Sequence, residues 1–323
     1  MPQGSTVFLE KAIKRWTIKR SQEGLYVKDI IAPKQPVDDQ SGYFRIYSIE
    51  HLTSQLGTSL VGDRGDPPER DYKLSTDTFY CKNRAFKHFI PADVKRLAEQ
   101  PLRPEQDGAE LLVDEHQLEA EIRVRDLVQT LEDSDTTSTD VSIKWDAVGA
   151  TILEDLMGAK RKVRQGCSRN PNILLVPDHM MEVMLNNEGI QRIIREYRQI
   201  DLISGQYPPM ILGMNVVVPG ALQQTANLAL VTAPDTDSVV SDVWAVDSDA
   251  AASNNVYLIY SNASPGPRGM NYANQLIWTG FNSTLIHDEM PGASGGDYIK
   301  VSNSQDEKIV GTKAAHVLDD LLT

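Results

Sequence analysis

Cysteine is scarce in this sequence of 323 residues, and long apolar runs are missing. The two cysteines, Cys81 and Cys167, lie too far apart in the chain to indicate a disulfide framework or a zinc site. We expect both to be buried thiols, as in proteins of a reducing compartment. No run approaches the ~18 apolar residues of a membrane span, and residues 1–16 lack the apolar stretch of a signal peptide. The sequence therefore predicts a protein of a cytoplasm-like compartment with no membrane contact.

Motifs for nucleotide and metal chemistry are also missing. Neither the P-loop pattern G-x-x-x-x-G-K-S/T nor the dinucleotide fingerprint G-x-G-x-x-G occurs. The histidines never fall at the spacing that would place two imidazoles on one metal ion. They are His51, His88, His116, His179, His287 and His316. We therefore predict no catalytic, cofactor-binding or metal-ligating residue.

Acidic side chains outnumber basic ones, and the formal net charge is −13. This balance disfavours tight binding of nucleic acid, which needs clustered Lys and Arg. Between Gly220 and Asp297 the only basic residue is Arg268, so this stretch is chemically distinct. Its acidic residues are Asp235, Asp237, Asp242, Asp247, Asp249, Asp288, Glu289 and Asp297. The Asp residues from 235 to 249 lack the Gly and terminal Glu of an EF-hand loop. They therefore favour a solvated acidic loop over weak, non-specific binding of calcium.

The N-terminus, by contrast, is locally basic. Its cations are Lys11, Lys14, Arg15, Lys19 and Arg20. Such a run usually marks a solvated arm, and less often a contact with an anionic partner.

One enzymatic motif is formally present, because Gly292 to Gly296 read G-A-S-G-G around Ser294, with His316 downstream. A nucleophile elbow needs a buried strand before the serine and a helix after it. Here Pro291 precedes the serine, and the strand-like DYIKVS follows. The pattern favours a flexible hinge, and a serine hydrolase using Ser294 is the minor alternative.

The first part of the chain has a strand-like pattern. Apolar residues make up 41% and charged residues 24% of the sequence, which predicts a folded protein. Residues 25–33 and 43–49 are β-like, and the chain returns through a strand-like segment at 72–86. We predict a long hairpin whose tip, from Gly57 to Asp71, is rich in Gly, Pro and charge.

Two helices are predicted in the middle of the chain. The first covers about 115–132, with Asp114 and Gln117 as a capping box. Its apolar stripe is Ala120, Val124, Leu127, Val128 and Leu131. The second covers 147–165, with Asp146 as N-cap and Gly166 just past its end. Its apolar stripe is Val148, Ile152, Leu156, Ala159 and Val163.

The remaining chain is mostly β. A buried strand is predicted at 172–177 and a short helix from Asp178, whose methionines we expect in the core. Further strands are predicted at 210–220, 229–233, 256–262, 275–281 and 297–310. The amphipathic tail from Ala314 to Leu322 should pack back onto the body. The fold class is therefore α+β.

Several segments resemble the major capsid proteins of tailed bacteriophages. The first is IAPKQPVDDQSGYFRIYS at 31–48, and the second is STDTFYCKNRAFKHFIPADV at 75–94. Trp145 followed by a helix, RNPNILLVP and DHMMEVML keeps the order of elements in that family. The closing GGDYIKVSNSQDEKIVGTKAAHVLDDLL at 295–322 resembles its final strands and tail.

The resemblance implies a domain plan. Residues 1–40 would be an N-terminal arm and 41–85 an extended hairpin loop that reaches a neighbouring subunit. A peripheral domain would cover 86–220 and 290–323, with the spine helix at about 115–132. An axial domain at 221–289 would meet its copies around five-fold and six-fold axes.

The resemblance also implies a function. The chain would be a structural subunit that self-assembles, as pentamers and hexamers, into an icosahedral virion shell around double-stranded DNA, with only weak contact to that DNA. Its other partners would be a separate scaffolding protein, a portal and a decoration protein, with assembly in the bacterial cytoplasm. The alternative is the shell of a cellular nanocompartment of the same fold.

Overall fold

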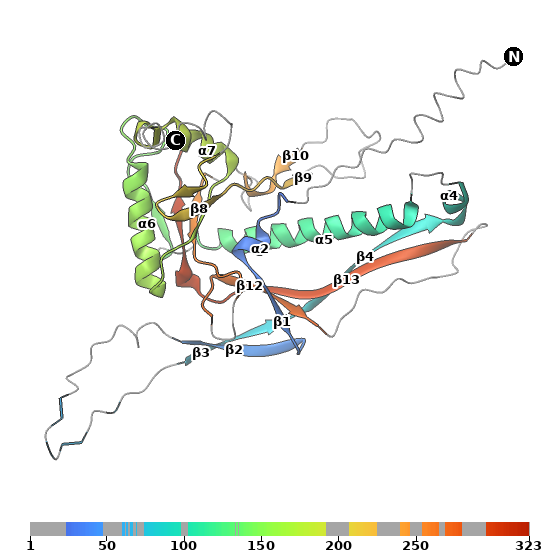
Figure 1. Cartoon of the computed structure of the whole chain (residues 1–323), viewed down its shortest axis with the longest axis horizontal. Helices are drawn as coiled ribbons and strands as arrows, with labels where there is room; N and C mark the ends of the chain where they lie inside the picture. The colour runs from blue at the N-terminus through green and yellow to red at the C-terminus, as the bar shows by residue number, and fades with distance from the viewer. Residues whose placement is uncertain are drawn as a thin grey trace.

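The structure is a computed structural model that describes residues 24–47, 74–97, 103–132, 136–191, 207–224, 240–245, 254–264, 269–279 and 295–322, with a few isolated positions. Within these ranges helices and strands are mixed, as the α+β prediction requires. Figure 1 shows a lobe that carries α6 and α7, a long helix α5 that leads away from it over a sheet, and a separate hairpin, β2 and β3.

The lobe is built on a six-stranded sheet of order β5-β14-β11-β6-β8-β7. These strands are β5 (Ser138–Asp140), β6 (Ile173–Leu175), β7 (Met210–Ile211), β8 (Met214–Val217), β11 (Val256–Ile259) and β14 (Ala315–Asp319). Every residue of β6 and β11 is buried, which is typical of central strands covered on both faces. Helices α6 (Ile152–Cys167) and α7 (Asp178–Asn186) add their apolar faces to the same core.

The long helix α5 (Pro104–Gln129) lies along a second sheet of order β1-β12-β13-β4 (Figure 1). Its strands are β1 (Lys34–Val37), β4 (Lys82–Pro91), β12 (Ala273–Trp278) and β13 (Gly296–Ile309). Short α4 (Ala92–Leu97) follows β4. The C-terminal half of α5 enters the lobe, because Val124 and Val128 belong to the same core as α6. Helix and sheet thus form a two-layer slab joined to the lobe.

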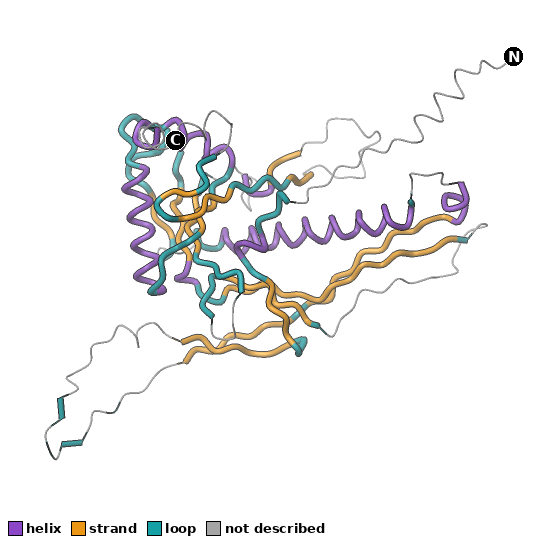
Figure 2. Tube along the Cα trace, viewed as in Figure 1, coloured by secondary structure: helices purple, strands orange, loops and turns teal. Residues whose placement is uncertain are grey.

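The hairpin pairs β2 (Ser41–Tyr47) with β3 (Leu74–Tyr80) in antiparallel register. Figure 2 shows it extending away from both the slab and the lobe. The predicted hairpin is confirmed, and most of its tip from Gly57 to Asp71 lies outside the described residues. The small elements are α2 (Lys28–Ile31), β9 (Leu222–Gln224), β10 (Val240–Asp242), and the 3-10 turns η2 (Val243–Ala245) and η3 (Thr312–Ala314).

The first predicted helix starts too late. Helix α5 begins at Pro104, so Asp114 lies inside it and is no cap. Asp107 instead accepts a hydrogen bond from the Arg103 N–H at 3.2 Å. In the first turns the buried positions are Gly108, Leu112 and His116, and this stripe lacks the repeated apolar residues by which helix faces are recognised.

The second predicted helix starts too early. Helix α6 begins at Ile152, and Val148 is 104% exposed on a turn where Gly149 has φ +88°. The helix also runs on past Gly166 to end at Cys167. A Cβ at Gly166 would lie 2.8 Å from the Lys313 carbonyl oxygen, so the glycine permits close packing instead of ending the helix.

The N-terminal segment differs in part from its β-like prediction. Residues 28–31 form α2, because Glu121 accepts hydrogen bonds from the N–H groups of Val27 and Lys28. Strand β1, which the sequence assigns to the arm, pairs in parallel with β12. Residues 25–37 are therefore part of the folded body.

The later elements follow the predictions closely. Strands β6, β8, β11, β12 and β13 are found where strands are expected, and the strand predicted at 229–233 lies outside the described residues. Met180, Met181 and Met184 are buried in the core, and the tail packs back as β14. Residues 221–289, however, contribute β11 to one sheet and β12 to the other. The predicted boundary between the peripheral and axial domains therefore does not follow the sheets.

Candidate assembly surfaces

The spine helix α5 is fixed to the sheet by charged side chains as well as apolar ones. Arg123 forms a two-pronged ion pair with Glu307 on β13. Arg84 on β4 binds Glu119 at 3.0 Å. Further out, Ile90, Leu112 and Ile299 form a small apolar cluster between the layers. These contacts hold helix and sheet together as one unit.

A second buried charge fixes the chain where it leaves the N-terminal segment. The carboxylate of Glu121 is fully buried and accepts hydrogen bonds from Val27 N–H, from Lys28 N–H at 2.9 Å and from the indole N–H of Trp244 at 2.7 Å. Nearby, Arg125 donates to the carbonyl of Val243 at 3.1 Å. The helix α5 thus joins α2 and η2 through two charged side chains.

No motif in the sequence marks Glu121 or the Arg123–Glu307 pair. The only signal for Glu121 is its place beside Ala120 and Val124 on the apolar stripe. An acidic residue on a buried face must have partners, but the sequence does not say which.

The hairpin is anchored to β13 at its base and by one ion pair further along, in which Lys308 contacts Asp77 at 3.6 Å. At the base Gln40 and Cys81 exchange hydrogen bonds, and the N–H of Tyr80 donates to Asp306 on β13 at 3.0 Å. Beyond the base, Tyr43 is 64% exposed. Within the described residues no helix or second sheet covers either face of the hairpin. Isolated two-stranded hairpins are marginally stable in water, so this one is suited to pack on another molecule.

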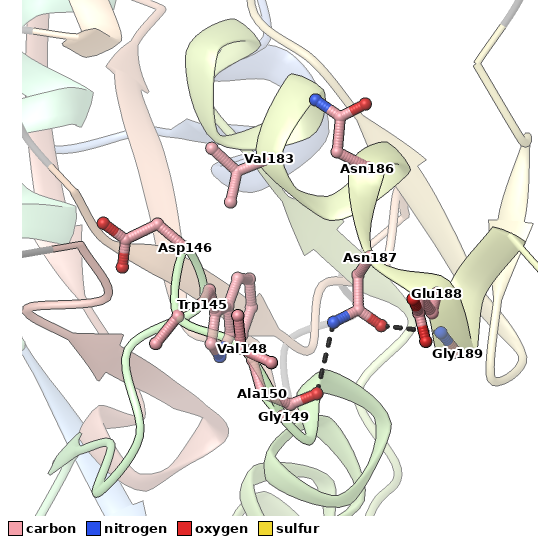
Figure 3. Close-up of a pocket in the computed structure, with 11 residues that line it drawn as sticks. Trp145, Asp146, Val148, Gly149, Ala150, Val183, Asn186, Asn187, Glu188 and Gly189 are labelled. Atoms are coloured by element: carbon pink, nitrogen blue, oxygen red, sulfur yellow. Dashed lines mark hydrogen bonds between the residues drawn. The ribbon is translucent and has the colours of Figure 1, made fainter.

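The lobe carries a half-open hollow of about 580 Å³. Figure 3 shows Trp145 and Val183 beside the turn that carries Val148 and the end of α7. Asn187 closes one side, donating to the carbonyl of Ala150 at 3.2 Å and accepting from the N–H of Gly189 at 3.0 Å. The described lining contains no Ser, Cys, His or Lys. Its ionisable lining residues are the carboxylates Asp146 and Glu188.

The formal nucleophile motif is not followed by a helix. Ser294 lies outside the described residues, but β13 begins at Gly296, directly after Gly295. His316 lies in β14, where its Nε2 is 2.8 Å from the hydroxyl of Thr139. Burial, with a smaller effect of the Lys162 ammonium, lowers the pKa of His316 to about 4. Its partner is thus a hydroxyl of the neighbouring strand β5.

The other predicted absences concern metal and membrane. Among the described residues no group of three or more His, Cys, Asp or Glu side chains could hold a metal ion. Of the Asp residues from 235 to 249, only Asp242 is described, and it pairs in register with Leu222. In the described ranges, no helix combines the length and apolar character that crossing a membrane requires. Cys81 and Cys167 are buried free thiols.

Comparison with known proteins identifies the fold. No family model and no curated protein sequence matches the chain. Solved structures match over nearly its full length. A phage-related protein of Bordetella bronchiseptica has a TM-score of 0.63 at 15% identity, with 93% of each chain covered. The capsid structure of cyanophage P-SCSP1u has a TM-score of 0.63 at 10% identity, with 95% of this chain and 91% of that chain covered.

A third structure is described as an encapsulin complex. The encapsulin complex of Synechococcus elongatus has a TM-score of 0.56 at 11% identity, with 99% of this chain and 96% of that chain covered. The chain thus has the fold of tailed-phage major capsid proteins, which the encapsulin shares.

Proposed function

We propose that this chain is a major capsid protein, the structural subunit of the icosahedral shell that encloses the DNA of a tailed bacteriophage. The observation that carries the proposal is the hairpin of β2 and β3, which extends from a full-length capsid fold and, within the described residues, pairs with no third strand. A hairpin of this kind gains stability when it lies on a neighbouring subunit.

The fold suggests a role for each part. Residues 1–24 are assigned to an arm and 41–85 to the intersubunit loop. The slab of α5 with β1, β12, β13 and β4 is assigned to the peripheral domain. The lobe on the six-stranded sheet is assigned to the axial domain, in place of residues 221–289 alone, since β11 is inseparable from β6 and β14.

The proposed partners are further copies of the chain, arranged as pentamers and hexamers in a virion shell assembled in the bacterial cytoplasm. A separate scaffolding protein, a portal and a decoration protein complete the set. Packaged DNA would be touched weakly, because the chain carries a net charge of −13.

We also propose that the chain has no enzymatic activity. The strand that follows Gly295 cannot provide the helix of a nucleophile elbow. Ser294→Ala should leave assembly unchanged, and serine-directed phosphonate probes should leave the protein unlabelled. Stoichiometric labelling that is lost in the alanine variant would establish a hydrolase instead.

The second candidate is the shell of a cellular nanocompartment, which the match to an encapsulin favours. Electron microscopy of the purified protein tests both shell functions against tubes, rings or monomers. The contents of particles isolated from the native source separate the two shells. DNA inside particles that bear tails supports the phage capsid, whereas a protein cargo inside tailless particles supports the nanocompartment.

A further inference from the structure

The two-layer slab has one face that α5 leaves uncovered. Side chains of a strand alternate between the faces of its sheet. On β4, His88 points toward α5, because a Cβ built on Gly108 of that helix would lie 2.9 Å from its ring. Its neighbours Lys87 and Phe89 therefore lie on the opposite, outer face.

The outer face carries a compact patch where β4 pairs with β13. Phe89 lies opposite Tyr298, with ring centroids 4.8 Å apart, and Lys87 lies opposite Lys300. The Lys87 ammonium is 5.1 Å from the centroid of the Tyr298 ring. We call these four residues the lysine–aromatic patch. Like charges directly opposite each other destabilise a sheet, so the pairing of Lys87 with Lys300 is unfavourable in the isolated chain.

Among the described residues, neither lysine of the patch has a carboxylate partner. On the other side of the slab cations are paired, as Arg84 is with Glu119 and Lys95 with Asp297. The patch therefore offers two ammonium groups and two rings to a partner that is acidic and partly apolar.

A surface that is acidic and partly apolar lies on the outer side of α5. Asp107, Glu110, Leu111 and Asp114 follow the i, i+3, i+4, i+7 spacing of one helix face. Leu111 is 49% exposed, whereas Gly108 and Leu112 are buried toward the sheet. We call these four residues the acidic ridge. Within the helix, Glu110 accepts a hydrogen bond from the side-chain amide of Gln106 at 2.9 Å, and Asp107 accepts one from the Arg103 N–H at 3.2 Å.

We propose that the lysine–aromatic patch of one copy binds the acidic ridge of a second copy of this chain. Ammonium groups would meet carboxylates, and Phe89 and Tyr298 would cover Leu111. Patch and ridge lie on opposite layers of one slab, so the contact is heterologous and can repeat from copy to copy. The proposal rests on the proposed self-assembly and names two of its surfaces.

Charge reversal on each side tests the contact with full-length protein. Lys87→Glu with Lys300→Glu should raise the subunit concentration needed for half-maximal assembly roughly tenfold or more. Glu110→Lys with Asp114→Lys should have the same effect. An equimolar mixture of the two variants should assemble again, because each reversed surface then meets its complement. Sedimentation velocity and light scattering provide the readout, and circular dichroism checks the fold.

The matched control is Arg96→Glu with Arg161→Glu, which gives the same change in net charge on other exposed positions and should assemble normally. Should either reversed variant misfold, Lys87→Gln with Lys300→Gln should still weaken assembly. Normal assembly of the folded reversal variants would overturn the proposed contact but not the proposed function. Loss of binding to a DNA oligonucleotide in these variants would not change that conclusion. A mixture that stays unassembled would also overturn it. Unmodified protein that stays monomeric would reject the proposed function as well.

Discussion

The guanidinium of Arg123 on α5 donates two hydrogen bonds, each 2.9 Å, to the carboxylate of Glu307 on β13. The side chain of Glu307 is 5% exposed, and Arg123 also contacts Glu119 at 3.2 Å. A paired geometry of this kind fixes both distance and orientation between helix and strand. The pair therefore sets the position of α5 along the sheet.

Glu307→Gln should destabilise the fold by about 2–3 kcal/mol, because it leaves the Arg123 charge buried with only Glu119 as a partner. Replacing both residues, as Arg123→Met with Glu307→Leu, should cost less than the single change. The measurement is urea unfolding of the dissociated subunit. Asp29→Asn, which breaks the exposed pair with Lys34, is the control and should cost at most about 1 kcal/mol. Equal losses in both variants would contradict this account.

Glu121→Gln should destabilise by about 2–3 kcal/mol and loosen residues 25–37, since a neutral amide replaces a carboxylate that accepts three N–H groups. Trp244→Phe removes a single one of these bonds and should cost about 1 kcal/mol. Hydrogen exchange should show faster exchange at Val27 and Lys28 in the glutamine variant. Unchanged protection there would show that apolar packing alone holds the segment.

His316 should make the fold sensitive to mild acid. Its pKa is about 4 in the folded chain and close to 6.5 when unfolded, so the unfolded state binds the proton first. The stabilisation is present above pH 6.5 and is lost as pH falls toward 4, by about 3 kcal/mol. His316→Gln should flatten the loss of stability over this range. The exposed His88→Gln is the matched control, and an equal flattening there would contradict the role of His316.

The sequence predicted the elements whose apolar pattern is continuous. The sequence correctly predicts strand β6, because a strand buried on both faces is a continuous apolar run. It also predicts α6, because a helix buried on one face has a periodic apolar stripe, here Ile152, Leu156, Ala159 and Val163. The hairpin followed from strand patterns on either side of a tip rich in Gly and Pro. The resemblance to capsid proteins supplied the fold that the solved structures confirm.

The sequence failed where polar contacts decide the structure. The first turns of α5 bury Gly108 and His116, so the helix is longer than its apolar stripe. Helix α2 forms because Glu121, distant in sequence, binds its first N–H groups. The division of residues 221–289 between two sheets depends on strand pairing across the chain, which local periodicity does not contain.

Deleting Gly57–Asp71 should spare the fold of the subunit and block shell formation. The described body has its own core without these residues, and the hairpin contacts it through Tyr80 and Asp77, outside the deleted segment. Circular dichroism and thermal unfolding report on the fold, and electron microscopy reports on assembly. A variant that replaces the segment with a Gly/Ser linker of equal length keeps the length of the loop and removes its side chains. It therefore distinguishes the role of the loop's sequence from that of its length. Normal shells from the deletion variant would show that the loop is dispensable.

The central claim is that the subunit closes into a shell through the hairpin of β2 and β3. A cryo-EM reconstruction of particles assembled from the purified protein tests it most directly. The predicted result is a closed icosahedral shell in which Tyr43 and the rest of each hairpin lie on a neighbouring subunit. Tubes, rings or monomers, or a shell whose hairpins fold back on their own subunits, would contradict it.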